Sequence, residues 1–127
     1  MNLNKKKIII DLDDTICTTK NGDYTKSSPN TEVIQKLCEY KDIGFEIIIH
    51  TSRNMRSYKG NIGLINAKTL PIIIDWLERN KVPYDEIIVG KPWPSFGGFY
   101  VDDKAIRPNE FVDLSYSEIQ NLINDNN

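Results

Sequence analysis

Short apolar runs alternate along this chain with stretches in which apolar residues recur at helical spacing. The runs predict four β-strands, at 7–11, 45–50, 86–89 and 98–101. Helical spacing predicts three helices, which begin near 28–31, at about 66 and at about 115. This order predicts an α/β fold, a Rossmann-like parallel sheet with helices on both faces.

Local signals mark the helix ends. Residues 28–31, Ser-Pro-Asn-Thr, supply a proline and capping side chains, and Gly44 ends the first helix. Pro71 should lie in the first turn of the helix at 66–80, because an interior proline would break it. Residues 115–118, Ser-Tyr-Ser-Glu, form a capping-box signature. The positions expected to face the core are Val33, Ile34, Leu37, Cys38, Ile73, Trp76, Leu77, Ile119, Leu122 and Ile123.

Length and composition bound the class of protein. The chain has 127 residues, which suits a single domain over 1–127. A net charge of −2 gives no reason to expect a nucleic-acid partner. We expect no membrane segment, because no apolar run approaches the length of a bilayer span and no signal peptide precedes the first strand. Two cysteines without metal-ligand spacing, Cys17 and Cys38, favour a cytoplasmic protein with reduced thiols.

Polar residues follow each predicted strand directly. Asp11 and Asp13 follow the first, residues 51–53 (Thr-Ser-Arg) end the second, residues 90–92 (Gly-Lys-Pro) follow the third, and residues 102–104 (Asp-Asp-Lys) end the fourth. Ligands of parallel sheets bind at the carboxyl ends of the strands, so these side chains should meet at one edge. Paired carboxylates suit Mg²⁺, and an aspartate beside such a metal can attack phosphorus. The plainer alternative is a set of solvated turns.

The first acidic cluster resembles a known family motif. Asp11-Leu12-Asp13-Asp14-Thr15 is similar to the DxDxT motif of the haloacid dehalogenase (HAD) superfamily, most of whose members are Mg²⁺-dependent phosphatases. The order of acid, hydroxyl, lysine and acid along the chain is similar to the order of the four HAD motifs. The resemblance covers essentially the whole chain and implies a single HAD-like hydrolase domain.

The resemblance implies a role for each motif residue. Asp11 would be the nucleophile that forms an aspartyl-phosphate, and it would also bind Mg²⁺. Asp13 would be the general acid and base, with its backbone carbonyl on the metal and its side chain free for proton transfer.

The other three motifs complete the implied machinery. Thr51 would donate a hydrogen bond to the phosphoryl group, and Lys91 would neutralise charge on the phosphate and the nucleophile. Asp102 would complete the metal shell, with Asp103 as a supporting or water-mediated ligand.

The spacing between motifs leaves no room for a cap domain. The intervals 15–51 and 51–91 must each hold a loop, a helix and a strand. The chain therefore resembles the capless HAD class, in which only a flap at 18–27 and a loop at 53–63 remain to cover the site. Capless members act on bulky substrates or let a neighbouring subunit cover the pocket, which implies a homo-oligomer.

Several residues near the motifs are candidate substrate contacts. Arg53 and Arg56 could hold a second anionic group of the substrate, or they could be solvated loop charges. Trp93 is a candidate wall for a sugar ring, and large aromatic residues near turns also pack under loops. Ser52 and Lys104 complete the predicted substrate-binding set.

Three longer stretches narrow the resemblance. His-Thr-Ser-Arg-Asn-Met at 50–55, Gly-Lys-Pro at 90–92 and Tyr-Val-Asp-Asp-Lys-Ala-Ile-Arg-Pro at 100–108 are similar to short capless HAD hydrolases of bacterial capsular polysaccharide biosynthesis. This similarity implies a Mg²⁺-dependent phosphomonoesterase whose small phosphorylated substrate is a phosphosugar or a sugar-linked intermediate. The alternatives are a phosphatase that acts on phosphoproteins and a HAD-fold protein that binds a partner enzyme without turnover.

Overall fold

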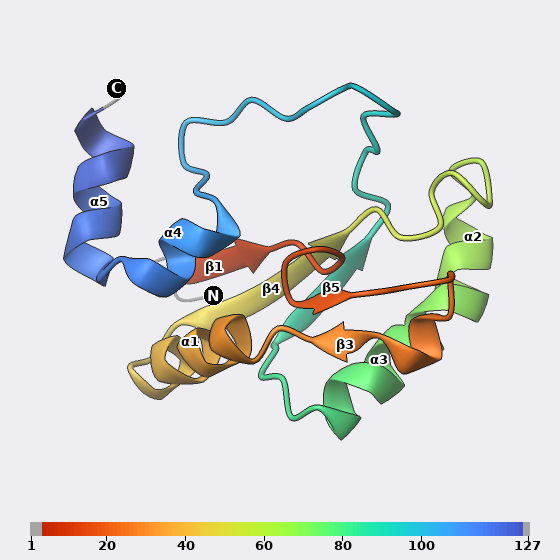
Figure 1. Ribbon diagram of the computed structural model, residues 1–127, viewed down its shortest axis with the longest axis horizontal. Coiled ribbons are helices and arrows are strands. Elements are labelled where there is room, and N and C mark those ends of the chain that lie inside the picture. The colour runs from red at the N-terminus through yellow and green to blue at the C-terminus, as the bar shows by residue number, and fades with distance from the viewer. Residues whose placement is uncertain (1–3, 126–127) are drawn as a thin grey trace. The chain divides into compact units, whose positions relative to one another are not determined.

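The protein is described over residues 4–125 by a computed structural model. The chain separates into two compact units, Met1–Trp93 and Pro94–Asn127, and each is described by itself. The first unit holds the sheet and its crossover helices, and the second holds two short helices (Figure 1). No helix within residues 4–125 is both long and apolar enough to cross a bilayer.

A three-stranded parallel sheet forms the centre of the first unit. Its strands are β1 (Lys7–Ile10), β4 (Glu46–Thr51) and β5 (Glu86–Val89), in the order β1-β4-β5 (Figure 1). Ile9 lies opposite Ile48, and Ile49 lies opposite Ile87. Because all three strands run in the same direction, their carboxyl ends reach one edge of the sheet. The predicted α/β class with a parallel sheet and flanking helices is confirmed.

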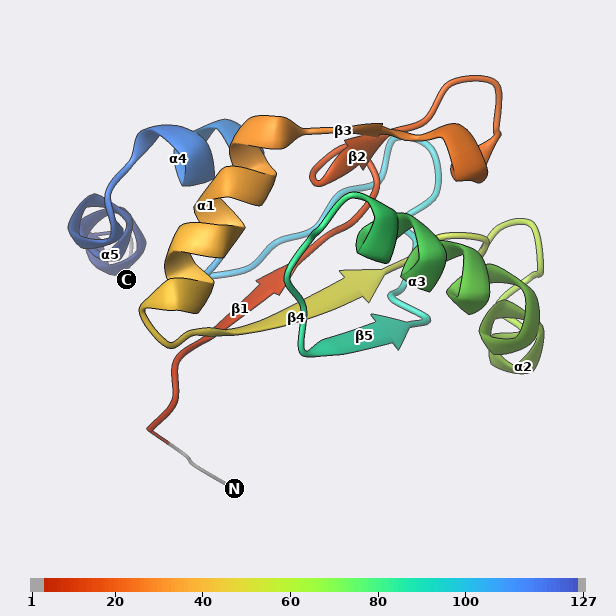
Figure 2. The same ribbon diagram turned by 90° about the horizontal axis from the view of Figure 1, so that it is seen from below.

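The two crossover helices of the first unit cover the same face of the sheet. They are α1 (Thr31–Asp42) and α3 (Leu70–Arg79), and both lie on one side of the strands (Figure 2). Two right-handed crossovers that step across a sheet in one direction produce this arrangement. The core between them is formed by Val33, Leu37, Ile47, Ile49, Ile73 and Leu77. The strand residues Ile9, Ile48 and Ile88 alternate to the opposite face.

Helix α1 begins and ends where the sequence predicts. The Asn30 side chain accepts a hydrogen bond from the Val33 amide at 3.3 Å, and Gly44 follows the helix with a φ of +102°. Glycine adopts this left-handed conformation without steric cost. Of the predicted core positions, Val33 and Leu37 are buried, Ile34 and Cys38 are half-buried, and Tyr40 is an additional buried residue.

The second helical segment begins earlier than predicted, at Ile62 instead of 66. It runs through α2 (Ile62–Leu64), a π-helical stretch η2 (Ile65–Thr69) and α3. Pro71 does lie in the first turn of α3, but helical backbone precedes it. A proline lacks an N–H and crowds the carbonyl one turn back, and the wider π turn just before it relieves that conflict. The predicted core residues Ile73, Trp76 and Leu77 are all buried.

The predicted strand at 98–101 is not formed. Within the described part of the chain no ladder includes these residues, and Phe99 and Val101 are 79% and 88% exposed. The prediction of a strand here was wrong, because an apolar run becomes a strand only where a neighbouring backbone supplies the ladder hydrogen bonds. The local sequence cannot supply that neighbour.

The second unit contains α4 (Pro108–Asp113) and α5 (Tyr116–Asp125). Helix α4 was not predicted, since six residues are too few to show a helical period. The predicted capping box of α5 is confirmed: the Glu118 amide donates to Ser115 Oγ at 3.2 Å, and the Ser115 amide donates to Glu118 Oε1 at 2.9 Å. Ile119 is buried, and Leu122 and Ile123 are half-buried. The last two residues of the polar tail at 124–127 lie outside the described range.

Candidate active site

Three predicted catalytic residues meet at the carboxyl edge of the sheet. Asp11 follows β1, Thr51 ends β4 and Lys91 follows β5. The Lys91 amide donates a hydrogen bond to the Thr51 carbonyl at 3.1 Å, which carries the pairing of β4 and β5 past the end of β5. The ammonium Nζ of Lys91 lies 3.9 Å from Asp11 Oδ1. A carboxylate, a hydroxyl and a lysine therefore come together as the order of motifs predicts.

The Asp11 carboxylate is oriented but still open to a ligand. Its Oδ1 accepts a hydrogen bond from the Leu12 amide at 2.9 Å and faces Lys91, whereas its Oδ2 accepts no hydrogen bond in the described part of the first unit. Burial raises the pKa of Asp11 above its usual value, and the nearby Lys91 charge and the Leu12 amide oppose that rise. Asp11 thus presents one oxygen to a metal ion or an electrophile, while Lys91 compensates the charge of the Asp11 carboxylate.

Removing the lysine charge should shift the titration of Asp11. Because Lys91 lowers the pKa of Asp11, Lys91→Met is expected to move that pKa to a higher pH in the metal-free protein. The carboxyl carbon chemical shift of Asp11, followed by NMR against pH, measures this directly. Lys59→Met, which removes an exposed lysine from the loop at 53–63, is the matched control and should leave the midpoint in place. If the Asp11 titration midpoint stayed unchanged or fell in Lys91→Met, the result would contradict the placement of Lys91 beside Asp11.

A tight loop at residues 12–17 follows Asp11 and carries Asp13. The Leu12 carbonyl accepts hydrogen bonds from the amides of residues 15, 16 and 17, at 3.3, 2.9 and 3.2 Å, and the Asp14 amide donates to the Cys17 carbonyl at 2.7 Å. Asp14 adopts a left-handed conformation with a φ of +62°. The loop turns the chain back on itself at Asp14, which brings Cys17 beside Asp13.

Asp13 forms a two-pronged ion pair with Arg53. The Arg53 Nε donates to Asp13 Oδ2 at 3.1 Å and its Nη2 donates to Asp13 Oδ1 at 2.9 Å. Arg53 is only 5% exposed, and a buried guanidinium needs a charged partner. One expectation therefore differs from the structure: the Asp13 side chain is held by Arg53 and is not free. The contact of Arg53 with an anionic group of a substrate stays a prediction.

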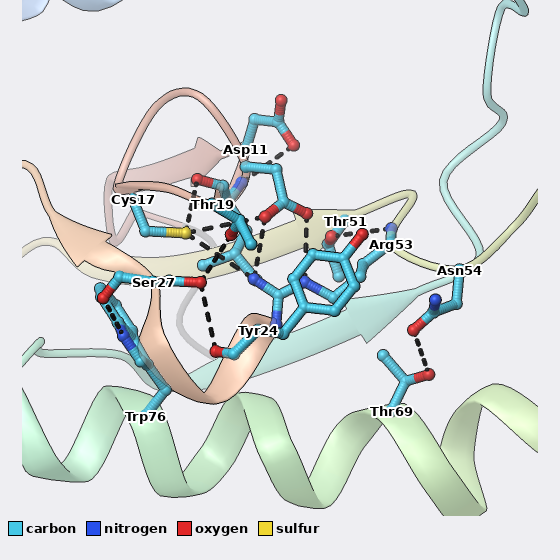
Figure 3. Close-up of polar contacts among 12 residues, drawn as sticks. Asp11, Cys17, Thr19, Tyr24, Ser27, Thr51, Arg53, Asn54, Thr69 and Trp76 are labelled. Carbon is cyan, nitrogen blue, oxygen red and sulfur yellow. Dashed lines mark hydrogen bonds and ion pairs between the residues drawn. The ribbon is translucent and has the colours of Figure 1, made fainter. Parts of the chain in front are cut away.

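The flap at 18–27 brings an aromatic ring onto this ion pair. It includes η1 (Tyr24–Lys26) and is bounded by the short antiparallel strands β2 (Cys17–Thr18) and β3 (Ser28–Pro29). The Arg53 guanidinium carbon lies 4.1 Å from the centre of the Tyr24 ring (Figure 3). The Trp76 indole nitrogen donates to the Ser27 carbonyl at 2.9 Å and ties the flap to α3. Sequence analysis missed Tyr24, since no motif marks one aromatic residue within a flap.

The buried thiol of Cys17 lies beside the ion pair. Its Sγ is 3.7 Å from both Asp13 Oδ1 and Arg53 Nη2. Burial, followed by the Asp13 charge, raises the pKa of Cys17 to about 12. The thiol is therefore protonated at neutral pH, and a protonated thiol is neither a good nucleophile nor a metal ligand.

Two predicted substrate contacts lie against each other. The Arg56 guanidinium carbon is 5.9 Å from the centre of the Trp93 ring, a cation–π distance. The loop that carries Arg56 is tied to η2 by a hydrogen bond from Thr69 Oγ1 to Asn54 Oδ1 at 2.7 Å. Ser52 is half-buried, and its carbonyl accepts a hydrogen bond from the Met55 amide at 3.0 Å. The loop is thus ordered around an exposed cation and aromatic ring.

Comparison with solved structures finds a close relative. A crystal structure of an MCSG target from Vibrio cholerae is 51% identical in sequence, with a TM-score of 0.94 over 96% of this chain and 99% of that chain. The two chains belong to one family. No protein-family model and no curated protein matches the chain.

A more distant likeness supports the fold alone. A chain of the Pnkp1/Rnl/Hen1 complex is 20% identical, with a TM-score of 0.53 over 88% of this chain and 36% of that chain. The family that this protein shares with the Vibrio cholerae target thus has an α/β architecture that is also found within a much longer chain.

The predicted metal ligands of this family member lie in both compact units. Asp11 and Asp13 belong to the first unit, while Asp102 and Asp103 belong to the second and are exposed. Asp102 Oδ1 accepts a hydrogen bond from the Lys104 amide at 2.9 Å, so the two predicted residues share one turn. No group of three or more His, Cys, Asp or Glu side chains in residues 4–125 forms a metal site.

The first unit by itself fits part of a Mg²⁺ shell. The open Oδ2 of Asp11 is the hard oxygen ligand that Mg²⁺ prefers. Arg53 occupies both carboxylate oxygens of Asp13, which leaves the Asp13 backbone carbonyl as the ligand that the HAD resemblance assigns.

Proposed function

We propose that the protein is a capless HAD-type, Mg²⁺-dependent phosphomonoesterase that forms an aspartyl-phosphate on Asp11. One observation carries this proposal. The Asp11 carboxylate follows the parallel strand β1, accepts a hydrogen bond at its Oδ1 only, and has the Lys91 ammonium 3.9 Å from that Oδ1. Phosphoryl transfer requires an in-line nucleophile and compensation for the charge on the transferring oxygens, and this pair supplies both.

The first half-reaction transfers the phosphoryl group to Asp11. A carboxylate oxygen of Asp11 forms the new bond to phosphorus while the bond from phosphorus to the leaving oxygen breaks. A protonated Asp13, with one of its oxygens released from Arg53, gives the leaving oxygen its proton. Lys91 neutralises charge on the phosphoryl oxygens as a compact cation. The Thr51 hydroxyl accepts a hydrogen bond from the Arg53 amide at 3.1 Å, so its own proton can be donated to a phosphoryl oxygen. Bound Mg²⁺ would supply further charge compensation between the phosphate dianion and Asp11.

The second half-reaction returns Asp11 to its starting state. Asp13 takes a proton from water, the water oxygen attacks phosphorus, and the bond from phosphorus to Asp11 breaks. The ion pair with Arg53 holds the Asp13 carboxylate in one orientation, while 31% of the Asp13 side chain stays exposed to a substrate or to water. Arg53 therefore acts through Asp13 as a positioning residue.

The proposed substrate is a small phosphorylated metabolite, a phosphosugar or a sugar-linked intermediate. The pairing of Arg56 with Trp93 supports this class. Trp93 offers an aromatic face on which a sugar ring can pack, and Arg56 offers a cation for a second anionic group. Trp93 follows Lys91 by two residues, which links this surface to the catalytic lysine. A cytoplasmic location remains a prediction from the sequence.

Phosphate release from an aryl phosphate and a panel of phosphosugars tests the proposal. We expect release in Mg²⁺ and at least about a 100-fold loss after chelation, because a bound metal contributes several kcal/mol to phosphoryl transfer. Sodium chloride at matched ionic strength is the control for a general salt effect. Phosphate release from phosphoproteins, but not from the phosphosugars, would replace the proposed phosphosugar substrate with a phosphoprotein. Folded protein that releases phosphate from neither panel would overturn the proposed function.

A further inference from the structure

Arg53 is a buried cation whose hydrogen bonds to a carboxylate lie along one edge only. Its side chain is 2% exposed, and its Nε and Nη2 donate to the two carboxylate oxygens of Asp13. The third nitrogen, Nη1, is buried as well and has no hydrogen-bond partner in the described part of the first unit. A buried charge is costly unless neighbouring groups offset it. The pairing with Asp13 therefore leaves the rest of the guanidinium to be stabilised by another group.

The Tyr24 ring lies against the face of this guanidinium. The guanidinium carbon of Arg53 is 4.1 Å from the centre of the ring (Figure 3). The face of an aromatic ring is the negative part of its quadrupole, and it attracts a cation more strongly where water is excluded. Burial, followed by the Asp13 charge, raises the pKa of the Tyr24 phenol, so the ring is neutral at neutral pH. Tyr24 therefore offers Arg53 a π face and not a negative charge.

The flap at 18–27 is anchored in a way that gives the Tyr24 ring a fixed place. The Ser27 hydroxyl donates a hydrogen bond to the Tyr24 carbonyl at 3.2 Å, and the Ser27 carbonyl accepts one from the Trp76 indole at 2.9 Å. The Arg79 Nη2 donates to the Thr25 carbonyl at 3.0 Å. Ser27 and Trp76 are both buried. Helix α3 thus holds the backbone on the C-terminal side of Tyr24 through two separate hydrogen bonds.

We propose that Tyr24 is a positioning residue, which holds the Arg53 guanidinium in place and through it orients the Asp13 carboxylate. This role rests on the proposed function, in which Asp13 is the general acid and base. Asp13 alternates between a protonated and a charged form in that reaction, so its hold on Arg53 changes during each turnover. The contact of Arg53 with the Tyr24 ring does not depend on that proton. The ring therefore keeps the guanidinium ready to orient Asp13 in both half-reactions.

Steady-state kinetics test the role of the ring. Tyr24→Leu keeps an apolar cover over Arg53 and should lower kcat about 10-fold or more, with KM within about threefold, because a misplaced catalytic group slows the chemistry. Tyr24→Phe keeps the ring and should restore kcat to within about threefold of the wild type. Tyr84→Leu is the matched control, since Tyr84 is also half-buried but lies before the amino end of β5, where its hydroxyl donates to Glu78.

Two kinetic results would overturn the proposal. A higher KM with unchanged kcat in Tyr24→Leu would show that Tyr24 contacts the substrate instead of positioning Arg53. A loss in Tyr24→Phe as large as that in Tyr24→Leu would assign the effect to the phenol hydroxyl instead of the ring face.

A fluorinated ring separates electrostatic attraction from shape. Pentafluorophenylalanine in place of Tyr24 keeps an aromatic ring of similar shape but withdraws the negative charge from its face. We expect its kcat to fall about as far below that of Tyr24→Phe as the kcat of Tyr24→Leu does. A kcat equal to that of Tyr24→Phe would show that the ring acts by shape alone and would overturn the proposal. This protein also decides the question if Tyr24→Leu does not fold.

Hydrogen exchange at Arg53 tests the contact without any activity measurement. The Arg53 Nε–H, which donates to Asp13, can be followed by nitrogen-15 NMR in the metal-free protein. Tyr24→Leu should speed its exchange with water about 10-fold or more, the scale of a desolvated cation–π contact, whereas Tyr24→Phe and Tyr84→Leu should leave the rate within about threefold. An unchanged rate in Tyr24→Leu would overturn the proposal even in an active enzyme. A wild type that releases no phosphate would overturn the proposed function, whereas the exchange rates would still show whether Tyr24 holds Arg53.

Discussion

Asp11→Asn is expected to lower phosphate release by about 10³-fold or more, because an amide nitrogen or oxygen cannot replace the attacking carboxylate. Asparagine keeps the shape of the side chain and one oxygen that can face the Leu12 amide and Lys91, so the local structure should persist. Initial rates in saturating Mg²⁺ measure the loss. A variant that keeps a near-normal rate would end the aspartyl-phosphate mechanism.

The same substitution should raise the stability of the metal-free protein at neutral pH. Burial raises the pKa of Asp11 in the folded state above its unfolded value, so the stabilising contribution of the protonated group is present at low pH and is lost as pH rises through the folded pKa. At pH 7 the charged carboxylate therefore opposes folding, and asparagine removes that charge. The melting temperature of Asp11→Asn should exceed that of the wild type at pH 7, with a smaller difference under acid conditions. A lower melting temperature at pH 7 would mean that the variant disturbs the fold.

Asp14→Asn is the matched control for both effects. Asp14 lies in the same turn, is exposed, and has a left-handed backbone that asparagine also tolerates. Its rate should stay within about threefold of the wild type, as expected for a group that makes no transition-state contact. If Asp14→Asn lowered the rate of phosphate release as much as Asp11→Asn, the loss would be due to the removal of negative charge from the turn. It would then not be evidence that Asp11 is the nucleophile.

Arg53→Met is expected to lower the free energy of unfolding by about 3 kcal/mol. The substitution leaves Asp13 without the guanidinium that holds both of its carboxylate oxygens, and it removes the cation from the Tyr24 ring. The Arg53 side chain is 2% exposed, whereas that of Asp13 is 31% exposed, which places the estimate at the low end for a broken buried pair. Urea unfolding followed by circular dichroism measures the change.

An exposed ion pair supplies the control for this prediction. Arg79 and Asp75 are joined at 2.8 Å on the solvent side of α3, and Asp75→Asn, which leaves the Arg79 hydrogen bond to the Thr25 carbonyl in place, should cost less than about 1 kcal/mol. Asp13→Asn should then destabilise the Arg53→Met protein less than it destabilises the wild type, because the two side chains act as a pair. Strictly additive losses would show that the ion pair contributes no coupling energy.

The elements that the sequence predicts correctly are those whose signals are local. A run of isoleucines predicts each of the strands β1 and β4. The helix starts are predicted by their capping residues, Asn30 and Ser115. Because parallel strands end at one edge, the positions of Asp11, Thr51 and Lys91 also follow from strand order alone.

Other features depend on contacts that no local pattern contains. A buried guanidinium must find a counter-charge, but only the fold decides that Arg53 meets Asp13 and lies on the Tyr24 ring. The earlier helix start at Ile62 likewise reflects how a helical chain accommodates Pro71 through a π turn.

The sequence by itself determined the α/β class, three of the four predicted strands, and the meeting of Asp11, Thr51 and Lys91 at the carboxyl edge of the sheet. Hydrophobic periodicity and chain direction are sufficient for those features, since both can be read from residues that are adjacent in the sequence. Only the tertiary structure decided the partner of Asp13 and the state of residues 98–101. The physical reason is the same in both cases: an ion pair or a strand ladder is completed by a group that is distant in the chain, and proximity in three dimensions selects that group.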